Sequence, residues 1–257
     1  MKFGIVIPLK SKKISRDWQV TCDALKNTIN SIVNQSDSMF TVIVAGHDCP
    51  LFLLALNDAR IRFVEVNYIA PDRTGANFTI KDLINDKNLK IITGLNALIG
   101  EQIDWVYQLD SDDLIRSDFI ESIRNFPQVP AIIIEGGYLL YQSAYRVIET
   151  NELDNLCGST VVVNKKYLDL PDVISLEKIH DIPWTKYRHM NIYKFFLGLD
   201  KECIRTQEKL VTYLLASGDN FSDRWRDSLF KKLKWKLKPY IQGSKITKEF
   251  KKKFAIG

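Results

Sequence analysis

Residues 105–115, WVYQLDSDDLI, decide the expected fold and the place of the expected site. Residues 105–109 are mostly apolar and suit a short buried strand. The acidic loop that follows at once, Asp110-Ser111-Asp112-Asp113, carries three carboxylates that are costly to bury unpaired. Aspartates one residue apart can converge on a hard cation such as Mg²⁺ or Mn²⁺. The alternative is a solvated loop that caps the helix expected near Ser117.

Short apolar strands alternate with amphipathic helices upstream of this segment. Strands are expected at residues 3–8 (FGIVIP), 40–45 and 61–66, and helices at 18–35 and 82–99. This alternation predicts an α/β domain with a mainly parallel central sheet, which binds its ligands outside the carboxyl ends of the strands.

The pattern changes downstream of residue 117. Helices are expected at 117–125 and 186–199, strands at 131–135, 160–163 and 210–216, and an aromatic-rich hairpin or edge segment at 138–148. Since no linker or repeat interrupts the chain before residue 223, residues 1–223 are predicted to form one domain.

The positive charge of the chain is concentrated at its carboxyl end. Residues 224–257 hold twelve Lys or Arg against Asp227 and Glu249, a net charge of +10. Because the whole chain carries +5, residues 1–223 carry −5. Charge confined to one terminal segment does not indicate a nucleic-acid-binding fold.

Residues 228–254 within this tail mix lysines with apolar side chains, and two interpretations stay open. A basic amphipathic segment that contains a Trp can lie on an anionic membrane surface. The same segment can also form a helical extension that packs on the domain while its lysines stay in water.

Targeting and redox motifs are absent from the sequence. No stretch of about 20 apolar residues could span a bilayer. The apolar residues near Met1 are interrupted by Pro8 and Lys10, so we expect the first strand of a cytoplasmic protein in place of a signal peptide. Four dispersed cysteines without a CxxC pair are expected to be buried thiols.

Four segments in order, FGIVIPLK, FTVIVAGHD, DKNLKIITGLNAL and WVYQLDSDDLI, resemble a family 2 glycosyltransferase of the GT-A fold, and the resemblance spans residues 3–220. It implies a single GT-A domain that uses a nucleotide-sugar donor and Mn²⁺ or Mg²⁺. The family's DXD motif matches Asp110 and Asp112, with Asp113 as a further carboxylate for the metal.

The resemblance also implies where the donor binds. Pro8 would shape the nucleotide pocket, Asp48 would face the base, and Lys90 would lie near the diphosphate. Arg73, in the loop PDRTGANF, is a further candidate for the phosphates. Asp110 and Ser111 complete the set of residues expected to bind the nucleotide sugar.

Asp181, in the segment IHDIPW, best matches the position of the family's general base, with Asp172 and Glu177 as alternatives. Many relatives place a metal-binding His after the last strand, where this chain has Ser217. The cation then keeps water at that position, or His189 or His180 reaches it from the preceding loop.

The resulting hypothesis is an inverting, metal-dependent glycosyltransferase that moves a sugar from a UDP-linked donor to a glycan or lipid-linked acceptor in cell-surface polysaccharide or lipopolysaccharide synthesis. Alternatives are a nucleotidyltransferase, a phosphotransferase of the HAD type and a non-catalytic, membrane-associated module of the same fold. A nucleotidyltransferase should carry a glycine-rich loop after the first strand, but PLKSKK has no glycine. The aspartates of a HAD enzyme follow the first strand, whereas here they follow the fourth.

Overall fold

The central sheet has seven strands in the order β10-β6-β9-β4-β1-β2-β3, in a computed structural model that describes residues 2–215 and 237–257. Its strands are β1 (Phe3–Pro8), β2 (Phe40–Gly46), β3 (Ile61–Glu65), β4 (Trp105–Gln108), β6 (Ala131–Ile134), β9 (Val161–Asn164) and β10 (Ile204–Thr206). β9 runs antiparallel to both of its neighbours, and the other pairs are parallel. The sheet is thus mixed and mainly parallel, and the predicted α/β domain with a mainly parallel central sheet is confirmed.

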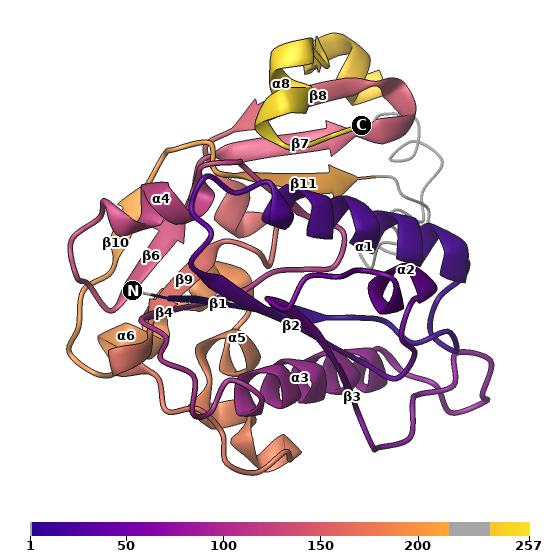
Figure 1. Cartoon of the computed structure of the whole chain (residues 1–257), viewed down its shortest axis with the longest axis vertical. Helices are drawn as coiled ribbons and strands as arrows, with labels where there is room; N and C mark the ends of the chain where they lie inside the picture. The colour runs from indigo at the N-terminus through magenta and orange to yellow at the C-terminus, as the bar shows by residue number, and fades with distance from the viewer. Residues whose placement is uncertain (1, 216–236) are drawn as a thin grey trace.

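Helices cover both faces of this sheet (Figure 1). α1 (Trp18–Val33) begins at Asp17, whose carboxylate accepts hydrogen bonds from two backbone N–H groups of the first turn. α3 (Ile80–Asn96) lies on the opposite face and begins with a capping box between Thr79 and Asp82. The shorter helices are α2 (Leu51–Leu54), α4 (Phe119–Arg124), α5 (Pro183–Lys186) and α6 (Tyr193–Leu197).

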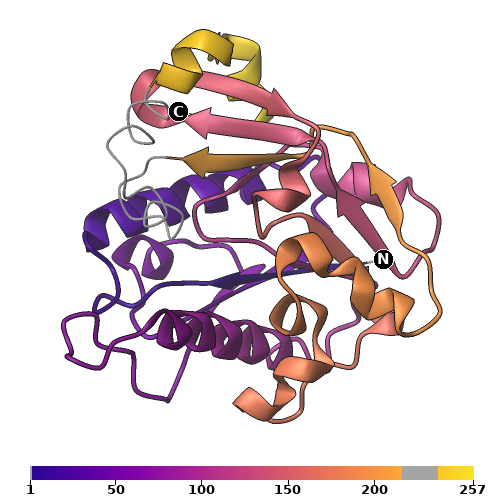
Figure 2. The same ribbon diagram turned by 180° about the vertical axis from the view of Figure 1, so that it is seen from behind.

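A second sheet, in the order β12-β8-β7-β11-β5, packs on the α1 side of the molecule, so that α1 lies between the two sheets (Figures 1 and 2). It consists of β5 (Leu114–Ile115), β7 (Gly137–Tyr141), β8 (Arg146–Thr150), β11 (Val211–Leu215) and β12 (Ser244–Lys245). β7 and β8 are the hairpin expected at 138–148. Since β5 directly follows the acidic loop, that loop joins the two sheets.

The described part of the carboxyl-terminal segment packs on this second sheet. β12 pairs with β8, and α8 (Lys248–Lys253) buries Phe250 in a small core that also contains Phe254 and Leu114. The side chains of Phe250 and Phe254 are therefore buried within the protein. Residues 216–236, which include Ser217 and the first part of the expected amphipathic segment, lie outside the described residues. No helix in the described ranges is both long and apolar enough to cross a bilayer.

The helix predicted at residues 186–199 is broken. α5 ends at Lys186, and the backbone is extended at Tyr187 and Arg188 before a single 3₁₀ turn, η5 (His189–Asn191), precedes α6. The break brings the imidazole of His189 to the carbonyl oxygen of Asp154, where it makes a 2.6 Å hydrogen bond. A tertiary contact thus overrides local helix propensity.

Candidate active site

Asp110 opens the acidic loop at the carboxyl end of β4. One of its carboxylate oxygens lies 2.6 Å from Nζ of Lys87 on α3 and accepts a 2.7 Å hydrogen bond from Gln108. Burial disfavours the charged carboxylate, but Lys87 outweighs it and holds the pKa of Asp110 below its usual value. A Cβ placed on Gly158 would lie only 2.9 Å from Asp110 Oδ2, so the glycine permits this close approach.

Asp112 is the second carboxylate of the loop and is only partly exposed. Burial and the neighbouring charge of Asp110 raise its pKa to about 6, although Lys10 and Lys87 act in the opposite direction. Because the charge of Asp110 raises the pKa of Asp112, a cation bound to both carboxylates would relieve the repulsion between them.

Asp113 does not fit the expected role of metal ligand. Its side chain is 0% exposed, and Oδ2 accepts hydrogen bonds from the Ser159 hydroxyl (2.6 Å) and the Cys157 thiol (3.0 Å). Burial and the other two aspartates raise its pKa well above the usual value. The carboxyl group therefore points into the protein, where it ties the acidic loop to the segment before β9. Ser159 continues this connection, because its Oγ accepts a hydrogen bond from the backbone N–H of Asp110.

Lys87, and not Lys90, is the α3 lysine that reaches the acidic loop. The Lys90 side chain is 1% exposed, and its Nζ is bonded to Asp86 one turn earlier on the helix, at 2.6 Å. Burial lowers the pKa of Lys90 despite this partner. The Lys87 side chain is 43% exposed, and its pKa is raised by Asp110 against the effect of burial. The sequence segment DKNLK contains both lysines, and the prediction named only Lys90, because the rotation of α3 cannot be read from the sequence.

The residues expected at the nucleotide lie around the ends of β1 and β2. Asp48 accepts a 2.8 Å hydrogen bond from the backbone N–H of Lys12, which joins the loops after the two strands. Arg73 donates to the carbonyl oxygen of Ile14 at 2.8 Å and so holds the same loop. Pro8 is buried at the end of β1. The Ser111 side chain is also buried, and its carbonyl oxygen accepts a hydrogen bond from Thr28 of α1.

The candidate bases lie in a segment packed against α3. Asp181 ends the 3₁₀ helix η4 (Leu176–Asp181), is 57% exposed, and has its carboxylate 3.6 Å from Nζ of Lys178. The same ammonium lies 3.4 Å from Asp172, and Glu177 is exposed in the first turn of η4. An accessible carboxylate is compatible with a general base, and the assignment of Asp181 stays a prediction.

His189 is the histidine that the structure relates to the acidic loop. A positive charge on its ring would help to lower the pKa of Asp110. Nδ1 makes the hydrogen bond to the carbonyl oxygen of Asp154, so this nitrogen is the donor and Nε2 carries the lone pair in the neutral ring. The break in the helix expected at 186–199 creates this arrangement.

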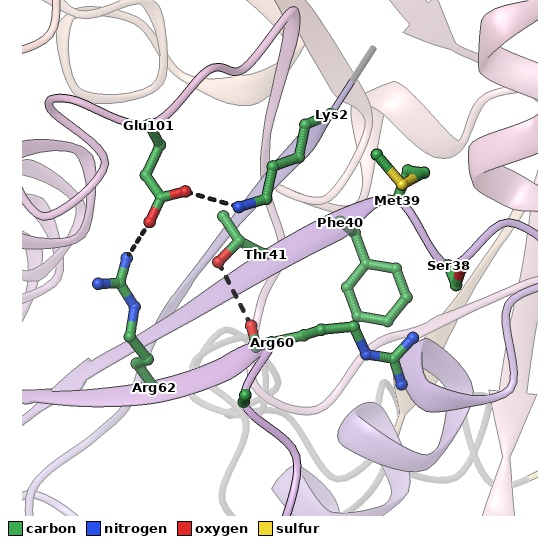
Figure 3. A pocket seen from close by; sticks show the side chains of 9 residues that line it. Lys2, Ser38, Met39, Phe40, Thr41, Arg60, Arg62 and Glu101 are labelled. Atoms are coloured by element: carbon green, nitrogen blue, oxygen red, sulfur yellow. Dashed lines mark hydrogen bonds and ion pairs between the residues drawn. The ribbon is translucent and has the colours of Figure 1, made fainter.

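A pocket of about 390 Å³ lies away from these residues, at the amino ends of the parallel strands (Figure 3). Its lining includes Lys2 before β1, Phe40 at the start of β2 and Arg60 before β3. Glu101 bonds both Lys2 and Arg62, as Figure 3 shows, and the Arg60 guanidinium is paired with Asp58 outside that view. The pocket is therefore separate from the acidic loop at the opposite edge of the sheet.

The donor set of the acidic loop fits a hard cation. Within residues 2–215 and 237–257, no three His, Cys, Asp or Glu side chains are grouped to hold a metal ion. Two carboxylates, Asp110 and Asp112, suit Mg²⁺ or Mn²⁺, because these ions usually keep waters and accept phosphate oxygens of a substrate in their remaining positions. Lys87 and Lys10 add positive charge beside them.

The fold is shared with solved structures, although no family profile and no curated protein matches the sequence. Residues 1–349 of S. aureus TarS match with a TM-score of 0.52 at 14% identity, over 83% of this chain and 60% of that one. The mannosyltransferase PcManGT from Pyrobaculum calidifontis, in complex with GDP-Man and Mn²⁺, matches with a TM-score of 0.51 at 12% identity, over 94% and 62%. The chain has the GT-A fold. The chain spans about 60% of the length of these two solved chains.

Proposed function

We propose that the protein is a metal-dependent, inverting glycosyltransferase that transfers a sugar from a nucleoside-diphosphate donor, UDP-linked, to a glycan or lipid-linked acceptor. The observation that carries this proposal is the 2.6 Å ion pair between Asp110 and Lys87, with the carboxylate of Asp112 in the same loop, at the carboxyl edge of a GT-A sheet. Cell-surface polysaccharide or lipopolysaccharide synthesis, in the cytoplasm, is the setting in which we place the reaction.

The chemistry requires charge stabilisation at the donor. When the bond between the anomeric carbon and the diphosphate breaks, its electron pair leaves with the diphosphate, whose negative charge grows. Asp110 and Asp112 would hold Mn²⁺ or Mg²⁺, which neutralises that charge when bound. The Lys87 ammonium, already beside Asp110, is placed to contribute from the protein side.

The acceptor supplies the new bond. Its hydroxyl oxygen attacks the anomeric carbon from the face opposite the diphosphate, so a single displacement inverts the configuration there. A general base must take the hydroxyl proton as this bond forms. We assign this role to Asp181, because its carboxylate is accessible and the following α5 holds the chain against α3.

A thermal-shift panel with UDP, GDP, dTDP and CMP, with and without Mn²⁺, tests the proposal on the wild type and on Asp112→Asn. A ligand at about 100 times its Kd stabilises by about 2.7 kcal/mol, which raises the Tm of a chain of this size by about 5–10 °C. We expect one nucleoside diphosphate to give this shift only with the metal, and the substitution to abolish it.

Asp169→Asn is the matched control, because Asp169 is exposed and follows β9 at the opposite edge of the sheet. It should keep the full metal-dependent shift. Stabilisation by no nucleotide would favour the non-catalytic module. The assigned base would be supported if the wild type transfers the sugar, whereas Asp181→Asn binds the nucleotide but transfers no sugar.

A further inference from the structure

Part of the surface beside β8 combines exposed apolar side chains with lysines and an arginine. Residues 237–242 are helical, and Leu237, Tyr240 and Ile241 have the spacing of one helix face. All three are exposed, Ile241 at 77% and Tyr240 at 59%. Tyr145, in the turn between β7 and β8, is a second exposed aromatic residue. Apolar side chains this exposed and this close in sequence mark an interaction surface.

Contacts between the two segments make this surface continuous. The Arg146 guanidinium lies 5.3 Å from the Tyr240 ring centroid and donates to the carbonyl oxygen of Gly243 at 2.6 Å. Lys245 on β12 pairs with Arg146 on β8, and Nζ of Lys251 lies 5.3 Å from the Tyr145 ring. We call this surface the carboxyl-terminal patch. It consists of Tyr145, Arg146, Leu237, Tyr240, Ile241, Lys245 and Lys251.

The patch lies in a strongly basic part of the chain. Residues 237–257 contain six lysines, and their acidic side chain, Glu249, is 2.9 Å from Lys253. A partner with a basic surface would be repelled by this net positive charge. Lysines around exposed Tyr, Leu and Ile side chains match the interface of an anionic bilayer, where tyrosines sit at headgroup level and lysines meet the lipid charge.

We propose that the carboxyl-terminal patch docks the protein on the surface of a bilayer that contains anionic lipid. A nucleic acid would use the lysines but would gain nothing from Ile241 or Leu237. A bilayer uses both kinds of side chain, and this difference decides between the two partners. The proposal concerns attachment only and does not depend on the assignment of the acidic loop.

Sedimentation of the full chain with lipid vesicles tests the docking surface. One set of vesicles contains phosphatidylcholine alone, and the other contains phosphatidylcholine and phosphatidylglycerol in equal parts. We expect binding to the anionic vesicles and weaker binding at high salt. Ile241→Asp should weaken the vesicle affinity about tenfold or more, because it removes an exposed apolar side chain that the bilayer would bury and adds a charge that the anionic lipid repels. Lys245→Gln should weaken it about fivefold.

The matched controls make the same two types of substitution at exposed positions outside the patch. Ile69→Asp, in an 89% exposed position after β3, and Lys26→Gln, on the exposed face of α1, should leave vesicle affinity unchanged. An unchanged Tm shows that Ile241→Asp is folded. Failure of the wild type to prefer anionic vesicles, or equal losses in the Ile241→Asp and Ile69→Asp variants, would overturn the proposal. Equal binding of a DNA duplex by wild type and Ile241→Asp, without vesicle binding, would identify a nucleic-acid surface in its place.

Discussion

At the scale of single residues, the acidic loop divides its three carboxylates between two tasks. Asp110 and Asp112 lie beside lysines and remain partly exposed, whereas Asp113 is enclosed and bonded to Ser159 and Cys157. The enclosed carboxyl group holds the loop in place, and the other two are the proposed ligands of the cation. Identical side chains thus acquire different roles from their depth and their hydrogen-bond partners.

The proton equilibrium of Asp112 predicts how cation binding depends on pH. Its pKa of about 6 means that the side chain is mostly protonated below that pH and charged above it. Because a metal ion binds the charged form, Mn²⁺-dependent nucleotide affinity should fall about tenfold between pH 7.5 and pH 5. Calorimetric titration across this range measures the effect. An affinity that stays constant would show that Asp112 is not a ligand.

The enclosed position of Asp113 predicts a loss of stability upon truncation. Asp113→Ala leaves the Ser159 hydroxyl and the Cys157 thiol without their acceptor, which should lower the free energy of unfolding by about 1–3 kcal/mol in urea denaturation. Asp113→Asn keeps an oxygen acceptor and should lose less. Metal-dependent nucleotide binding should survive in Asp113→Asn, and its disappearance from a stably folded variant would make Asp113 a ligand after all.

At the scale of elements, the seating of α3 on the sheet decides which of its side chains reach the site. Gly94 faces β1, and a Cβ built there would lie 2.3 Å from a methyl carbon of Val6. This close approach fixes the position and rotation of the helix. Lys90 is consequently turned into the buried pair with Asp86, and Lys87 is left beside Asp110.

Gly94→Ala should therefore destabilise the protein although alanine is the better helix former. Overpacking against β1 costs about 1–3 kcal/mol, which exceeds the gain of up to about 1 kcal/mol in helix propensity. Urea denaturation of Gly94→Ala, Val6→Ala and the double variant measures the coupling, and the double variant should lose less than the sum of the two. Gly198→Ala, where the nearest atom is 3.4 Å away, should change the stability by less than about 0.5 kcal/mol. A neutral Gly94→Ala would contradict the close packing.

At the scale of the whole molecule, the carboxyl-terminal segment forms part of the support of the acidic loop. Leu114 directly follows Asp113 and lies in the same small core as Phe250 and Phe254. The end of the chain thus packs behind the loop that would hold the cation, about 140 residues away in sequence.

Phe254→Ala should lower the free energy of unfolding by about 3–5 kcal/mol, because it removes a large side chain that is 1% exposed. We expect one cooperative transition, since the core that contains Phe254 is attached to the loop between the two sheets. Circular dichroism during urea denaturation measures both features. Leu237→Ala, at an exposed position of the same segment, should have an effect of less than about 0.5 kcal/mol. An early, separate transition in Phe254→Ala would instead show that the second sheet unfolds independently.

The sequence by itself determined the elements that depend on local periodicity. β1 was predicted with its observed bounds, and α1, β2 and β4 were predicted to within two residues at either end, because alternating strands and amphipathic helices are local patterns. The placement of Asp110 and Asp112 at a carboxyl strand end followed from the same pattern. An α/β domain with a mainly parallel central sheet could therefore be predicted from the sequence.

Only the tertiary structure decided which side chains meet. The rotation of α3 places Lys87 beside Asp110, and the side chain of Asp113 is enclosed by the protein. His189 bonds the carbonyl oxygen of Asp154, where the helix expected at 186–199 is broken. The second sheet adds β5, β11 and β12, which are distant in sequence, to the β7–β8 hairpin, and no local pattern records these long-range pairings. These features depend on packing and desolvation between remote residues, which a linear pattern of residue types does not encode.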